Sequence, residues 1–67
     1  MNFTLLFNNK KEEKLIPHDN YTINDLLYDL DLSSQTIVAK KNKEIVIEES
    51  IINENDEIQL IQIIYGG

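Results

Sequence analysis

The sequence predicts a small α+β roll, in which one helix packs on one face of a mixed sheet of four to five strands. Short segments with apolar residues at period two lie on both sides of a single amphipathic helical segment. The 67-residue chain is 42% hydrophobic, which is too apolar for a disordered protein at this charge. It contains no cysteine, so its core has to form by packing alone, near the lower size limit for such a fold.

The N-terminal segment predicts a β-hairpin. Residues 2–7 alternate at period two and place three apolar side chains on one face: Phe3, Leu5 and Phe7. A turn is expected at residues 8–11, because asparagine tolerates the left-handed conformation that tight turns require. The second strand is expected at residues 12–16 and ends before Pro17, which has no N–H to donate to a sheet.

The helix begins after Thr22, a residue suited to the N-cap position. Asp25 lies three residues later, where a capping box has Glu or Gln, and its charge complements the positive end of the helix dipole. One apolar stripe then follows the i, i+3, i+4, i+7 spacing of a buried helix face: Ile23, Leu26, Leu27 and Leu30. We therefore expect this stripe to cover one face of the sheet.

Three more strands are expected in the C-terminal half, at residues 36–40, 44–47 and 57–64. Turns at residues 41–43 and 53–56 separate them, and Ile51 and Ile52 are expected to fill the core from an irregular segment. The last strand is apolar on both faces, which predicts a central place in the sheet beside the first strand. This arrangement is the β-grasp, or ubiquitin-like, fold, and we expect it to span residues 1–64.

Charge and composition exclude several classes of function. The formal net charge is −6, and an acidic surface repels nucleic-acid phosphates and anionic lipids, so we expect no nucleic acid and no membrane among its partners. No apolar run approaches the roughly 18 residues of a membrane span, and no signal peptide is visible, so we expect a cytoplasmic protein. With one histidine, His18, and no cysteine, no metal site, cofactor or enzymatic activity is predicted.

The C-terminus carries the feature with chemical meaning. The sequence has two glycines, Gly66 and Gly67, and an average glycine frequency of roughly 7% gives such an ending in about one chain in two hundred. Residues without Cβ can enter a narrow active site and adopt backbone angles closed to other residues. We expect residues 65–67 to form a flexible tail that presents the Gly67 carboxylate to another protein. The alternative is a frayed end without a function.

The ending at residues 56–67, DEIQLIQIIYGG, resembles the C-terminus of ThiS-like sulfur carriers of the ThiS/MoaD ubiquitin-like family. The helix start at residues 22–27, TINDLL, is similar to that of the family, and the order of elements agrees, so the resemblance covers nearly the whole chain. It implies that a ThiF-like activating enzyme adenylates the Gly67 carboxylate. Sulfur from a persulfide donor protein then replaces AMP and leaves a thiocarboxylate. A monomer is the natural form of such a carrier.

The resemblance leaves the sulfur acceptor open. Thiazole synthase, for thiamine, is the first choice because the ending at residues 62–67 looks closest to ThiS. MoaD-like relatives pass sulfur to molybdopterin, and relatives of the ubiquitin-related modifier type serve tRNA thiolation or attach to lysines of other proteins. A plain binding module with incidental glycines is the remaining alternative.

Two departures from the family pattern affect a hairpin rather than the tail. Relatives often have Asn-Gly where this chain has Asn42 and Lys43. Asn42 can take the positive φ of such a turn, whereas Lys43 does so at a cost in energy. Lys41 also stands where relatives tend to be apolar. These changes put the geometry of the hairpin in question more than the activity.

Three further features each have two interpretations. Ile61 and Ile63 are expected on the face of the last strand opposite Ile58, Leu60 and Ile64. One interpretation is that they form a docking patch for the activating enzyme. The other is that loops of the same chain, or a second copy of the protein, cover them. Tyr65 is a recognition side chain or a tolerated one. Acidic residues cluster late in the chain and form a solvated face or steer a basic partner: Glu48, Glu49, Glu54, Asp56 and Glu57.

Overall fold

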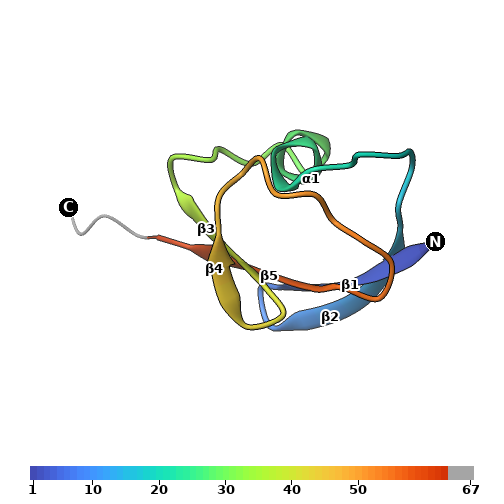
Figure 1. Cartoon of the computed structure of the whole chain (residues 1–67). Coiled ribbons are helices and arrows are strands. Elements are labelled where there is room, and N and C mark those ends of the chain that lie inside the picture. Colours follow the sequence, from blue (N-terminus) through green and yellow to red (C-terminus); the bar gives the residue numbers. More distant parts are fainter. Residues whose placement is uncertain (64–67) are drawn as a thin grey trace.

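The computed structural model describes residues 1–63 and shows one helix lying across one face of a curved sheet (Figure 1). The elements are β1 (Asn2–Phe7), β2 (Lys10–Leu15), α1 (Ile23–Asp29), β3 (Ile37–Lys41), β4 (Glu44–Val46) and β5 (Glu57–Gln62). The five strands are ordered β2-β1-β5-β3-β4, with β5 parallel to β1 and antiparallel to β3. The predicted β-grasp fold and the central position of the last strand are confirmed.

Both hairpins turn through two residues with positive φ, the geometry of type I′ turns. Asn8 and Asn9 have φ of 53° and 61° between β1 and β2, and Asn42 and Lys43 have φ of 51° and 74° between β3 and β4. Lys43 therefore adopts the left-handed conformation that glycine takes at no steric cost. The predicted start of β2 at residue 12 was wrong, because a two-residue turn lets pairing resume at once, with Phe7 opposite Lys10.

The helix begins with the predicted capping box. The Asp25 N–H donates to the Thr22 hydroxyl oxygen at 3.1 Å, and the Thr22 N–H donates to the Asp25 carboxylate at 3.1 Å. These bonds satisfy two backbone donors that a helix start otherwise leaves without partners. Three residues of the predicted stripe are buried, and the fourth, Leu30, packs partly buried against the core at the C-cap.

The core lies between α1 and the sheet. Its buried members are Phe3, Leu5, Tyr21, Ile23, Leu26, Leu27, Ile37, Ala39, Ile52, Ile58 and Leu60. Ile52 fills the core as predicted, but the prediction for Ile51 was wrong, since that side chain is 41% exposed. Ile51 pairs with Thr22 in an isolated antiparallel bridge, and extended backbone sends neighbouring side chains to opposite sides.

Tyr21 is a core residue that the sequence pattern did not indicate. Its hydroxyl donates to the Asp29 carboxylate at 2.6 Å, which ties the segment before α1 to the last residue of the helix. Burial, followed by this hydrogen bond, raises the pKa of Tyr21 above its ordinary range. The side chain therefore stays protonated and keeps donating at physiological pH.

The ends of the strands differ from the predicted ones by one or two residues. β5 ends at Gln62 because its partner β3 begins at Ile37, the residue opposite Gln62. The Ile63 N–H still donates to the Thr36 carbonyl at 2.8 Å, just beyond the ladder. Ile64, with which the predicted strand and domain end, lies outside the described residues.

Candidate functional site

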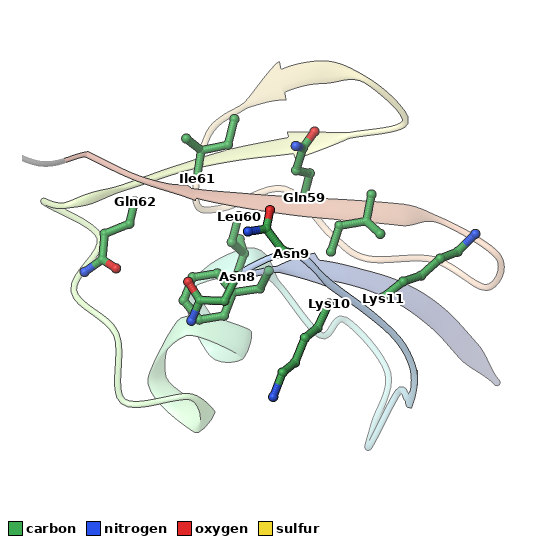
Figure 2. A pocket seen from close by; sticks show the side chains of 10 residues that line it. Asn8, Asn9, Lys10, Lys11, Gln59, Leu60, Ile61 and Gln62 are labelled. Atoms are coloured by element: carbon green, nitrogen blue, oxygen red, sulfur yellow. The ribbon is translucent and has the colours of Figure 1, made fainter.

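β5 presents different side chains on its two faces, and the sequence alternation predicted which. Ile58 and Leu60 are buried against the core, whereas Ile61 and Ile63 are 37% and 39% exposed. In Figure 2, the Ile61 and Gln62 side chains point to opposite sides of the strand. Both side chains are partly open to solvent in the described residues, so an apolar surface is available to a partner at the C-terminal end of β5.

This apolar surface is wider than the sequence predicted. Ile45 and Ile47 are 71% and 69% exposed, while Val46 between them packs against the core. Val38 of β3 lies directly opposite Ile61 in the ladder and is half-buried. We call these five residues the open-face patch: Val38, Ile45, Ile47, Ile61 and Ile63. Successive side chains of a strand point to opposite faces, so the apolar run at residues 45–47 puts apolar side chains on both faces and was the signal for the outer part of the patch.

A polar network fixes the other end of β5. The Asp56 carboxylate accepts from the Asn53 N–H at 2.7 Å and from the Asn42 side-chain amide at 3.0 Å. The Asn42 side-chain oxygen in turn accepts from the Glu57 N–H at 2.9 Å. Asp56 therefore joins the β3–β4 turn to the start of β5. Of the acidic cluster, this residue has a structural role and is not part of a solvated face.

Lys41, one of the two predicted departures from the family pattern, and its neighbour Asn42 take part in the same network. The Lys41 ammonium donates to the Ile51 carbonyl at 3.0 Å and lies 4.0 Å from the Asp56 carboxylate. The Asn42 N–H donates to the Glu57 carbonyl at 2.8 Å. Lys41 and Asn42 therefore both have partners, and the hairpin keeps its two-residue turn.

A shallow pocket of about 490 Å³ lies between the β1–β2 turn and the last residues of β5 (Figure 2). Asn8, Asn9, Lys10 and Lys11 line one side, and residues 59–62 line the other. The pocket and the open-face patch share Ile61, near the C-terminal end of β5. Sequence reasoning missed this pocket, because no pattern along the chain indicated that the two segments meet.

The predicted tail residues Tyr65, Gly66 and Gly67 lie outside the described residues. Within residues 1–63, no group of three or more histidine, aspartate or glutamate side chains is placed to hold a metal ion. In the same part of the chain, no helix is long and apolar enough to cross a membrane. The described site therefore consists of a strand end, an apolar patch and a pocket beside them.

Comparisons with known proteins bear on both the fold and the ending. No curated protein sequence matches the chain. SAMP1 from Haloferax volcanii is 14% identical, with full coverage of both chains and a TM-score of 0.73. A ubiquitin of Caldiarchaeum subterraneum is 14% identical, with 100% of this chain and 98% of that chain covered and a TM-score of 0.68.

The thiamine biosynthesis protein ThiS from Geobacter metallireducens is 17% identical, with 96% of this chain and 99% of that chain covered and a TM-score of 0.63. At these identities the structures show a shared ubiquitin-like fold. The family model described as "ThiS family" matches residues 3–67, which takes in the sheet, the helix and the Gly66-Gly67 ending. The chain belongs to the ThiS family.

Proposed function

We propose that this protein is a sulfur carrier whose Gly67 carboxylate is adenylated and then converted to a thiocarboxylate. The observation that carries the proposal is the ThiS family match, which runs through the sheet and on to the terminal Gly66 and Gly67. The protein is the substrate of this chemistry and supplies the carboxyl group. The catalytic groups belong to a ThiF-like activating enzyme.

The proposed chemistry has three steps: adenylation, sulfur transfer and reduction. A carboxylate oxygen of Gly67 attacks the α-phosphate of ATP, and pyrophosphate leaves. This step is needed because a carboxylate is a poor electrophile, whereas its adenylate has a good leaving group. The terminal sulfur of a persulfide on a donor protein attacks the acyl carbon and expels AMP. A second protein thiol reduces the acyl disulfide, which leaves a thiocarboxylate on Gly67 and a disulfide on the proteins.

The open-face patch gives the activating enzyme a surface to bind. Ile61 and Ile63 lie on the strand that leads into the tail, and Val38 and Ile45 extend the apolar area across β3 and β4. Contact with this patch would fix the direction of β5 and therefore aim the tail. We propose Tyr65 and Gly66 as the residues that the enzyme recognises in its channel, because they are adjacent to the reacting carboxylate.

We propose thiazole synthase, in thiamine synthesis, as the sulfur acceptor. The alternatives are a MoaD-like role with molybdopterin, and a modifier role that serves tRNA thiolation or ends in an isopeptide bond to lysine. The same activated carboxylate serves all of these, and they differ in the acceptor that receives the sulfur or the acyl group. We further propose a monomer that acts in the cytoplasm, where an activating enzyme and ATP are present.

The first test is the intact mass of the protein isolated from its own host, with the C-terminal peptide fragmented. The expected result is a subpopulation with sulfur in place of one oxygen at Gly67. Deletion of Gly67 is the matched control and should abolish this species. A carboxylate that stays unmodified with ATP and the ThiF-like enzyme of the same host would overturn the proposal and favour a plain binding module. Lysine conjugates without thiocarboxylate would favour the modifier role.

A further inference from the structure

The ladder between β1 and β5 stops before β5 does. Its last pair joins Leu6 to Gln59, whereas β5 continues to Gln62 in the ladder with β3. In a parallel ladder this last pair still uses the Leu60 N–H, so the side of β5 that faces β1 is open beyond that group and has no neighbouring strand there among residues 1–63. The pocket beside the β1–β2 turn lies along this open stretch.

The direction of the backbone groups shows what this open stretch offers. The Thr4 N–H of β1 donates to the Asp56 carbonyl at 2.9 Å, so Asp56 faces β1. Alternate residues of a strand face the same neighbour, so Leu60 and Gln62 face the β1 side as well. Beyond the last pair of the ladder, the Leu60 carbonyl and the Gln62 N–H therefore point toward the pocket. They are one acceptor and one donor with the spacing that a parallel strand uses.

Asn8 is the residue that would have met these groups if β1 had continued. Counting two residues on from the pair of Leu6 and Gln59 places Asn8 opposite Ile61, between Leu60 and Gln62. Instead, the positive φ of Asn8, 53°, turns the chain into the hairpin. One residue of an incoming strand in the same place would donate to the Leu60 carbonyl and accept from the Gln62 N–H.

The pocket is positive in an acidic protein. Lys10 and Lys11 line it and no acidic side chain does, although the chain has a formal net charge of −6. In the described residues the one ion pair joins Lys41 to Asp56, so both pocket lysines are free to bind a carboxylate from outside. Their position favours a segment that carries at least one acidic side chain.

We propose that an extended acidic segment of the activating enzyme adds to β5 in this pocket as a short strand. The proposal rests on the proposed function, since it names how that enzyme holds its substrate. Addition of a strand to an open sheet edge is an established mode of recognition, in which backbone bonds supply affinity and flanking side chains supply specificity. The added strand would bind β5 on the side opposite β3, four residues before the Gly66-Gly67 ending. It would thereby fix the direction in which the chain leads toward Gly67.

Amide hydrogen exchange tests the backbone contact directly. The Gln62 N–H should exchange at least about tenfold more slowly when the protein is saturated with the ThiF-like enzyme of the same host. The Leu60 N–H, on the side paired with β1, is the internal control and should be protected both free and bound. Unchanged exchange at Gln62 in a complex that forms normally would overturn the proposal.

Two pairs of variants test the contact through affinity for the same enzyme. Gln62→Pro removes the N–H on the open side, whereas Gln62→Ala keeps it, so only the former should weaken binding, by about fivefold. The double variant Lys10→Glu, Lys11→Glu should weaken binding by about tenfold at low salt and less at high salt. Lys14→Glu, on the same strand but outside the pocket, is its control and should bind nearly as the wild type does. If test and control variants bind equally well, no strand adds here.

Adenylation of the wild-type protein separates this inference from the proposed function. ATP–pyrophosphate exchange that depends on Gly67 supports the carrier role whatever the pocket does. Normal exchange together with insensitive pocket variants refutes the added strand alone. Absence of exchange with the wild-type protein refutes the carrier role, and with it the choice of the activating enzyme as occupant.

Discussion

The two ends of β5 are built differently, although they belong to one strand of six residues. At the Asp56 end, the backbone bonds to β1 on one side and to Asn42 on the other, and the Asn42 side chain reinforces the second contact. At the Gln62 end, the strand bonds to β3 and its other side borders the pocket. One end is fixed by its own chain, and the other is left available to a partner.

The difference shows how a small protein separates stability from binding. Local stability follows buried contacts and satisfied hydrogen bonds, so the Asp56 end should resist opening more than the Gln62 end. Substitutions at the two ends should therefore have different consequences. Those near Asp56 should reduce the stability of the fold, and those near Gln62 should reduce affinity while the fold remains.

The largest expected difference is between two isoleucines on this strand. Ile58 is 0% exposed and Ile61 is 37% exposed. Ile58→Ala should lower the free energy of unfolding by about 3 kcal/mol, because it leaves a cavity in the core, and Ile61→Ala should lower it by less than about 1 kcal/mol. Urea unfolding followed by circular dichroism measures both. Equal losses would mean that Ile61 is as important to the fold as Ile58. That result would contradict the proposed separation of stability and binding between residues of β5.

The next largest effect concerns Asp56. Asp56→Ala removes the acceptor for the Asn53 N–H and the Asn42 amide, and should lower the free energy of unfolding by about 2 kcal/mol. Glu54→Ala is the control, because that side chain is exposed on the same loop, and should change it by less than about 0.5 kcal/mol. The same urea titrations apply. If the two variants are equally stable, the network contributes nothing to the fold and the Asp56 end is no firmer than the other.

The sequence was a good guide where a structural feature is local. Thr22 and Asp25 lie three residues apart, so the capping box was visible in the sequence. The apolar faces of β5 followed from alternation within the same strand. The Asp56 network was not predictable in this way, because its partner Asn42 lies 14 residues earlier and the pattern gives no sign that the two meet.

The same distinction between local features and features that join distant parts of the sequence applies to the candidate site. Ile61 and Ile63 were predicted from the alternation of the last strand. The pocket depends on where β1 stops relative to β5, which is a matter of register between strands far apart in sequence. Gly66, Gly67 and Tyr65 were identified from the sequence and from the resemblance to ThiS-like carriers, and their roles stay predictions.

The smallest expected effect compares the two hairpin turns. Lys43 has a φ of 74°, where its Cβ is crowded against the backbone, so Lys43→Gly should raise the free energy of unfolding by about 0.5 to 1 kcal/mol. Lys43→Ala is the control and should give no gain, because it keeps the Cβ while it removes the charge. Asn9→Gly, at a φ of 61° in the turn beside the pocket, should gain less, because asparagine tolerates this conformation. An equal gain from Lys43→Ala would assign the effect to charge, and the turn at the firmer end of β5 would then carry no backbone strain.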